Sequence, residues 1–179
     1  MERKNYKTTQ NIMLFFTLLV LFVGFYIENV YNLTPCPLCL MQRFCIFIIG
    51  FFCFISFSFK TQRGALHLAI LQILVAILGL YFSSRQIWLQ SLPLEEGKMC
   101  LPGVEAVAHY FSNGNIFKTF LWGSTSCSEV AWTGYYGLSM PVWAAIYFGI
   151  MILFNSLVAI IIKLRLKRDN KLAFDSHKN

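Results

Sequence analysis

Four segments of this chain are long and apolar enough to cross a lipid bilayer. The hydrocarbon core of a bilayer is about 30 Å thick, and an α-helix needs roughly 20 residues to cross it. The sequence offers such runs at about residues 11–30, 40–59, 65–83 and 141–162. Of the 179 residues, 57% are hydrophobic and only 13% are charged, which is far from the composition of a soluble domain. We therefore expect an all-α membrane protein, a single domain (1–179) folded as a four-transmembrane-helix bundle.

The basic residues predict how the helices are oriented. Most of the 15 Lys and Arg residues precede the first segment, lie in the turn at residues 60–64, or follow the fourth segment. Loops rich in Lys and Arg stay in the cytoplasm, so we expect both termini, including the tail at 163–179, on that side. The net charge of +7 is explained by this topology and does not call for a nucleic-acid partner.

The largest segment outside these four helices is the loop at residues 84–140, which we expect to face outward. It contains short amphipathic stretches at residues 104–111 and 116–122, separated by Pro, Gly and Asn residues. Its Phe, Leu and Trp residues favour short amphipathic helices lying on the membrane surface.

Two cysteines stand at the start of the second segment, in the order Cys36-Pro37-Leu38-Cys39. Prolines are tolerated at the start of a helix but not in its interior, so Cys39 is expected in the first turn. Exposed N–H groups and the helix dipole favour an anion there, and hence a reactive thiolate. Together with Cys100 and Cys127 in the outward loop, this pattern indicates thiol–disulfide exchange in an oxidising compartment.

Arg43 follows Cys39 by four residues and is therefore expected on the same helical face, one turn deeper. A charged side chain near the hydrocarbon is costly and needs a reason. Snorkelling toward the headgroups is one reason. The spacing from the CxxC pair favours another, in which the cation holds a thiolate or polarises a bound carbonyl.

The cysteine pattern allows two other interpretations, a zinc site and inert structural disulfides. A zinc site normally pairs two close-spaced knuckles, and only one CxxC occurs here. Two inert structural disulfides are a stronger alternative, although a CxxC loop constrains little of the unfolded chain. Cys45 and Cys53 fall among apolar residues and are interpreted as structural. The three histidines are scattered, so we infer no metal site.

Three ordered blocks of the sequence resemble the DsbB family of bacterial inner-membrane proteins. The first is Pro35-Cys36-Pro37-Leu38-Cys39-Leu40-Met41-Gln42-Arg43, and the second is Arg85-Gln86-Ile87-Trp88-Leu89-Gln90-Ser91-Leu92-Pro93 ahead of Cys100. The third comprises Cys127-Ser128-Glu129, Trp132 and Gly137-Leu138-Ser139-Met140-Pro141-Val142-Trp143. This resemblance implies a bundle that reoxidises a periplasmic DsbA-like protein of the thioredoxin fold and passes the electrons to the membrane quinone pool, either ubiquinone or menaquinone.

The resemblance also implies a role for each site residue. Cys100, paired with Cys127, would be attacked by the partner and carry the mixed disulfide, and Cys127 would then engage Cys36. Cys39 would face the quinone beside Arg43. The residues implied to line the quinone pocket are Met140 and, as weaker candidates, Leu89 and Gln90. The sequence has no histidine between Arg85 and Cys100, where some family members have one, so no proton donor is named.

The resemblance places the protein in the inner membrane as a multi-pass protein, with the redox cysteines on the periplasmic side. A membrane scaffold whose loops are held by inert disulfides remains the alternative function. A convergent likeness to quinone-linked enzymes such as vitamin K epoxide reductase is disfavoured by the order of the three blocks.

Overall fold

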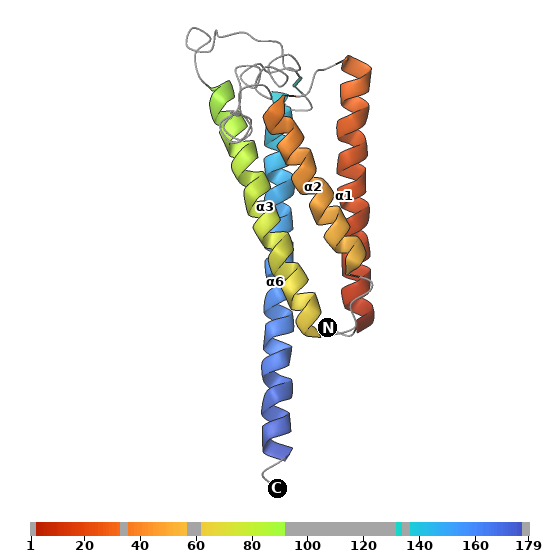
Figure 1. The fold of residues 1–179 in the computed structure, drawn as a ribbon, viewed down its shortest axis with the longest axis vertical. Helices are drawn as coiled ribbons and strands as arrows, with labels where there is room; N and C mark the ends of the chain where they lie inside the picture. The colour runs from red at the N-terminus through yellow and green to blue at the C-terminus, as the bar shows by residue number, and fades with distance from the viewer. Residues whose placement is uncertain (1–2, 33–35, 57–61, 92–131, 134–136, 177–179) are drawn as a thin grey trace, which may run out of the picture.

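The computed structural model describes residues 3–32, 36–56, 62–91, 132–133 and 137–176, and these residues are almost entirely helical. The helices are α1 (Arg3–Tyr31), α2 (Pro37–Ile55), α3 (Gln62–Gln90) and α6 (Met140–Ser176), shown in Figure 1. The one other regular feature in these ranges is an isolated antiparallel bridge between Thr133 and Ser139. The predicted all-α architecture with four long helices is confirmed.

Each helix is long and apolar enough to cross a membrane. The shortest, α2, has 19 residues and is about 28 Å long at 1.5 Å per residue, close to the thickness of a hydrocarbon core. Large apolar side chains point outward from the bundle; Phe15, Phe22 and Leu153, for example, are about 70% exposed. The protein is therefore a multi-pass membrane protein whose exposed apolar surface suits lipid.

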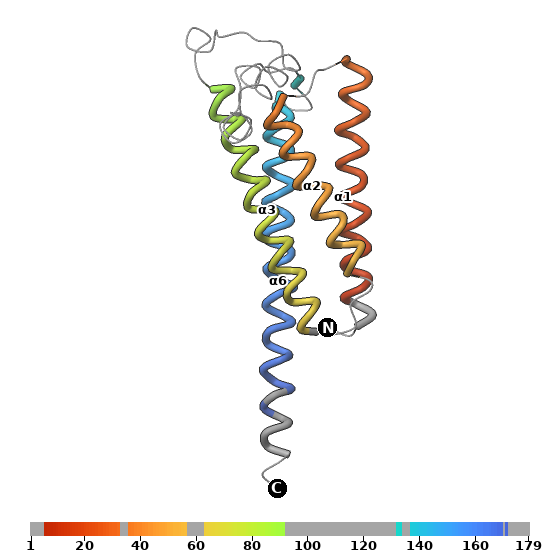
Figure 2. The backbone as a smooth tube through the Cα atoms, viewed as in Figure 1, coloured from red at the N-terminus to blue at the C-terminus, as the bar shows by residue number. Residues whose placement is uncertain are grey.

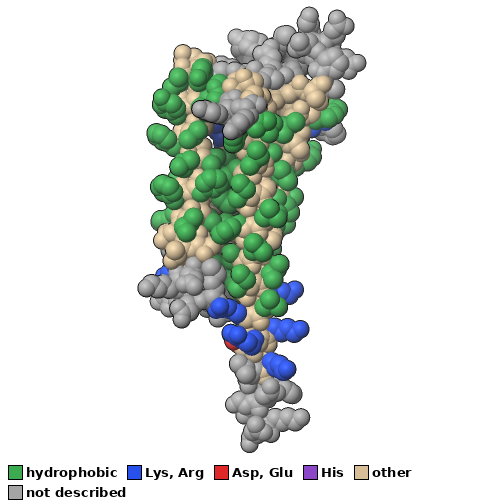
Figure 3. Space-filling model, turned by 180° about the vertical axis from the view of Figure 1, so that it is seen from behind, with side chains coloured by type: hydrophobic (Ala, Val, Ile, Leu, Met, Phe, Trp, Pro, Cys, Tyr) green, Lys and Arg blue, Asp and Glu red, His purple; other side chains and the backbone are tan. Residues whose placement is uncertain are grey.

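The helices run alternately up and down, and α6 projects well beyond the other three at the end where it terminates (Figures 1 and 2). The C-terminal ends of α1 and α3 lie together with the N-terminal ends of α2 and α6, and we call this the cysteine end because Cys36 and Cys39 are located there. The N-terminal ends of α1 and α3 and the C-terminal ends of α2 and α6 are directed toward the opposite end. Figure 3 shows Lys and Arg side chains gathered on the part of α6 beyond the apolar band.

Three helices extend well past the boundaries expected from the sequence. Helix α1 begins at Arg3, eight residues before the expected start at residue 11. Helix α3 continues to Gln90, so residues 84–90 are helical, whereas the sequence predicts that the loop begins at residue 84. No proline or glycine interrupts the chain between Gly79 and Pro93, and polar residues alone do not end a helix. Helix α6 likewise continues to Ser176, through most of the predicted tail. The short amphipathic helices expected at 104–111 and 116–122 lie outside the described residues.

Helices α3 and α6 approach each other closely at Gly79. A Cβ atom added at Gly79 would lie 2.2 Å from the ring of Phe148, which is itself fully buried. Glycine lets the two helix backbones come close enough for this ring to fill the space, as small residues do in membrane helix pairs. A buried hydrogen bond of 2.9 Å between Thr17 of α1 and Tyr147 of α6 adds a second link across the bundle. These contacts fix α3 and α6, which both carry residues to the cysteine end.

Candidate functional site at the cysteine end of the bundle

The CxxC sequence forms the N-terminus of α2. Cys36 is the N-cap residue, with φ −75° and ψ 160°, and Pro37 occupies the first helical position, where its missing N–H costs nothing. The Cys36 sulfur accepts a hydrogen bond from the backbone N–H of Cys39 at 3.4 Å, as an N-cap side chain does. Cys39 is thus in the first turn, as the sequence predicted.

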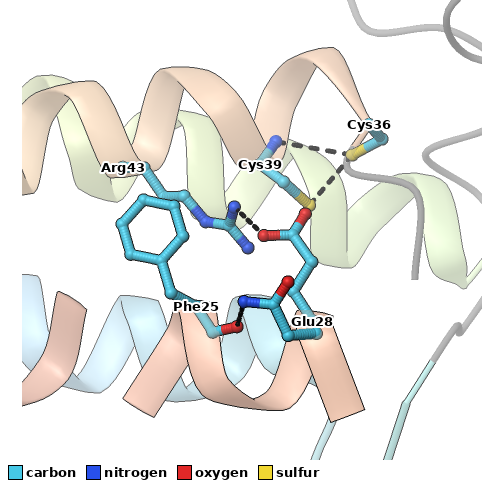
Figure 4. A network of polar contacts seen from close by, with 6 residues as sticks. Phe25, Glu28, Cys36, Cys39 and Arg43 are labelled. Atoms are coloured by element: carbon cyan, nitrogen blue, oxygen red, sulfur yellow. Dashed lines mark hydrogen bonds and ion pairs between the residues drawn. The ribbon is translucent and has the colours of Figure 1, made fainter. Parts of the chain in front are cut away.

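The two sulfur atoms face each other at 3.0 Å, with the Cys36 thiol donating to the sulfur of Cys39 (Figure 4). Cys36 is only 6% exposed, whereas Cys39 is partly exposed beside the apolar core. The two sulfurs are not joined by a disulfide in this structure. The geometry allows them to be joined or separated with little movement of α2, which suits thiol–disulfide exchange.

A buried glutamine of α3 contacts both sulfurs, and a second buried glutamine, on α2, hydrogen-bonds to the first. Gln86 of α3 is 3% exposed, and its Nε2 donates to the Cys39 sulfur at 3.1 Å and to the Cys36 sulfur at 3.5 Å. Its Oε1 accepts a 2.7 Å hydrogen bond from Nε2 of Gln42, which is 5% exposed. Buried amides are costly unless their polar atoms are paired, so this arrangement ties α2 to α3 at the cysteine pair.

Arg43 lies one turn below Cys39 and is held from the α1 side. Its Nη1 forms an ion pair with Oε2 of Glu28, and its guanidinium lies 5.0 Å from the centre of the Phe25 ring, within cation–π distance. In Figure 4 the Glu28 carboxylate reaches from α1 toward both Arg43 and Cys39. The other carboxylate oxygen, Oε1, is buried without a hydrogen-bond partner among the described residues.

The remaining predicted site residues divide into two groups. Leu89 and Gln90 lie in the last turn of α3, and Met140 is the first residue of α6, so all three are at the cysteine end and partly buried. Leu89 and Cys39 pack against the same apolar core. Cys100 and Cys127 lie outside the described residues.

Cys45 and Cys53 lie deeper in α2, 5% and 0% exposed, within the same apolar core. Their surroundings suit the interpretation of both as structural residues. The described part of the chain contains no group of three His, Cys, Asp or Glu residues that could hold a metal ion.

Three residues of the site were missed by the sequence analysis: Glu28, Gln42 and Gln86. Each is a polar side chain in or beside an apolar run, which is itself a signal of function or of a buried partner in a membrane protein. Gln42 and Gln86 even lie within two of the sequence blocks singled out above. Their partners come from different helices, so spacing along one helix could not identify them.

Comparison with known proteins decides the family. A family model described as "Disulfide bond formation protein DsbB" matches residues 6–158. The chain belongs to the DsbB family. The Disulfide bond formation protein B of Marinobacter nauticus is 36% identical over 140 residues, which cover 78% of this chain and 83% of the relative. That of Stutzerimonas stutzeri is 34% identical over 131 residues, which cover 73% and 80%, respectively.

A more distant DsbB relative extends the match along the chain. The Disulfide bond formation protein B of Acinetobacter baumannii is 28% identical over 153 residues, covering 84% of this chain and 89% of the relative. No solved structure matched the chain. The family is one of disulfide-forming proteins, and the cysteine end of the bundle is where the described part of this DsbB chain carries adjacent thiols.

Proposed function

We propose that this protein reoxidises a periplasmic DsbA-like protein of the thioredoxin fold and passes the electrons to membrane quinone. The proposal rests on the Cys36–Cys39 pair, whose sulfur atoms lie 3.0 Å apart at the N-terminus of helix α2. A dithiol in that position can exchange with thiols from the aqueous side and still lie beside the hydrocarbon. The DsbA disulfide is a strong oxidant, at about −120 mV, so electrons leave its dithiol only toward a still more oxidising acceptor.

The order of transfer follows the implied roles of the cysteines. The partner's thiolate attacks the Cys100–Cys127 disulfide at Cys100, and a second partner thiolate releases the oxidised partner. The Cys127 thiolate then attacks Cys36, which forms a Cys36–Cys127 disulfide, breaks the Cys36–Cys39 bond and leaves Cys39 as the thiolate. Attack of the Cys100 thiolate on Cys127 restores the Cys100–Cys127 disulfide and leaves Cys36 and Cys39 as a reduced pair. The assignment of the thiolate to Cys39 suits the site, because Cys39 accepts hydrogen bonds from both Cys36 and Gln86.

The residues around Cys39 are chemically suited to a quinone. A guanidinium has five N–H donors, so the Arg43–Glu28 ion pair leaves donors for a carbonyl oxygen. Apolar side chains at the same end, among them Phe25, Leu89 and Met140, suit a ring and its hydrocarbon tail. A bound quinone would supply the acceptor for two electrons and two protons. Arg43 would hold its carbonyl oxygen and stabilise negative charge there.

The proposal is tested with purified protein, a reduced DsbA-like partner and a soluble quinone. Oxidation of the partner should be catalytic and match quinone consumption one to one. Cys36→Ser and Cys39→Ser should each abolish turnover, whereas Cys45→Ala, which removes a buried thiol of the same helix, should retain it. Turnover that survives loss of Cys36 or Cys39 would support the alternative, a membrane scaffold with inert disulfides.

A further inference from the structure

We propose that Gln86 and Gln42 form an amide relay that makes the Cys36–Cys39 disulfide a stronger oxidant, by hydrogen bonding to the Cys39 thiolate in the reduced state. The inference deepens the proposed function, since it rests on redox cycling of this pair. In this relay Gln86 contacts the two sulfur atoms, and Gln42 is a positioning residue that acts through Gln86.

The arrangement of residues on α2 brings the relay together. Cys36, Cys39 and Gln42 are spaced three residues apart and therefore share one face of α2. Gln86 of α3 contacts all three of these side chains. Arg43 is instead paired with Glu28 of α1. The group of α3 that donates to Cys39 is thus the uncharged amide of Gln86, and the charged Arg43 is held by α1.

The orientation of the Gln86 amide suits a thiolate at Cys39, with the nitrogen nearer the sulfur than the oxygen is. The Gln86 Nε2 donor is 3.1 Å from the Cys39 sulfur, whereas the Oε1 acceptor is 3.5 Å away. A thiol would donate to the oxygen, and a thiolate can only accept from the nitrogen. Because Oε1 already accepts the 2.7 Å hydrogen bond from Gln42, the amide is oriented with its nitrogen toward the sulfurs. Gln42 thus fixes which end of the Gln86 amide meets Cys39.

The Gln86 hydrogen bond to Cys39 differs in strength between the oxidised and the reduced pair. When an external dithiol reduces the disulfide, the Cys36–Cys39 bond breaks and the pair takes up two electrons. The donor becomes a disulfide and loses two protons, one of which ends on the Cys36 sulfur and the other in water, while Cys39 remains a thiolate. The Gln86 hydrogen bond is strong only in this reduced state, because hydrogen bonds to an ionised acceptor are stronger than those to a neutral one. The relay therefore favours reduction.

The equilibrium constant for reduction tests the inference. The full-length chain carrying Cys100→Ser and Cys127→Ser is equilibrated in dithiothreitol buffers, and mass tags count the thiols after denaturation. Gln86→Met, which keeps the side-chain length but lacks the N–H donor, should lower the constant about tenfold. That change corresponds to about 30 mV for a two-electron couple. Gln42→Leu, which leaves Gln86 in place, should lower it about threefold by releasing the amide.

Ser84→Ala is the matched control, because Ser84 is an exposed residue of α3 whose hydroxyl donates to the Tyr81 carbonyl oxygen of its own helix. It should leave the constant unchanged. If a glutamine variant has the same equilibrium constant for reduction as Ser84→Ala, the relay is refuted. The test therefore needs only one of the two glutamine variants to fold. The assay contains neither partner nor quinone. A shifted constant together with absent quinone-linked turnover would therefore refute the proposed function and leave the relay standing.

Discussion

Glu28 of α1 and Arg43 of α2 form an ion pair across the interface between the two helices. The side chains are 16% and 19% exposed, so the pair is largely removed from solvent, and the Phe25 ring lies against the same guanidinium. A cation beside the hydrocarbon is thereby held by α1 as well as by its own helix. The position of Arg43 relative to Cys39 depends on tertiary packing and not only on the spacing within α2.

Replacing Arg43 should weaken the use of quinone. Arg43→Ala is expected to raise the quinone KM at least about tenfold, because a hydrogen bond to a charged or developing anionic group is lost. Arg43→Lys should have a smaller effect, since it keeps the charge but not the planar donor geometry. Steady-state kinetics with varied quinone measure both. An unchanged quinone KM in Arg43→Ala would show that Arg43 does not contact the quinone.

Glu28 and Arg43 should be energetically coupled. Removing either partner leaves a poorly solvated charge, so we expect a coupling free energy of about 1–3 kcal/mol from a double-mutant cycle of Glu28→Gln and Arg43→Gln. Unfolding in mixed micelles gives the four stabilities required. Additive effects of the two substitutions would show that the ion pair does not hold the helices together.

The Gly79 contact predicts a sharp steric effect in the middle of the bundle. Gly79→Ala places a methyl group against the Phe148 ring and should destabilise the protein by about 1–3 kcal/mol through overpacking. Gly149→Ala is the control, because a Cβ there meets nothing within 4 Å. Thermal unfolding in detergent compares the two variants. Equal stability would mean that α3 and α6 do not approach closely at Gly79.

Loss of Cys100 should separate capture of the partner from reduction of the CxxC pair. Cys100→Ala is expected to abolish the mixed disulfide with the partner, because the attacked sulfur is missing. The Cys36–Cys39 disulfide should remain reducible by a small dithiol, since its exposed face is unchanged. Non-reducing electrophoresis detects the mixed disulfide, and thiol labelling follows the CxxC pair. A mixed disulfide that still formed in Cys100→Ala would contradict the proposed order of transfer.

The sequence predicted those parts of the site that depend only on residues within a single helix. Cys36, Pro37 and Cys39 define a helix start because proline removes an N–H that a first turn does not need, and this local rule predicted the first turn of α2. The four apolar runs likewise predicted the four helices, because a bilayer fixes their length.

Contacts between helices account for what was missed. Glu28 and Gln86 lie on α1 and α3, where they contact Arg43 and the cysteines of α2, and no pattern within α2 identifies them. The helical end of α3 was missed for a different reason. Ser83, Ser84, Arg85 and Gln86 lower the local hydropathy, yet buried partners satisfy several of these polar groups, and the helix continues.

The redox state of Cys36 and Cys39 in membranes tests the central claim most directly. Membrane vesicles depleted of quinone are given a reduced DsbA-like partner, and mass tags report both cysteines before and after quinone is added back. The account predicts that the pair stays reduced until quinone is added and then becomes a disulfide, with oxidised partner accumulating in step. A pair that remains reduced after quinone is restored, or that oxidises equally well without it, would contradict the account.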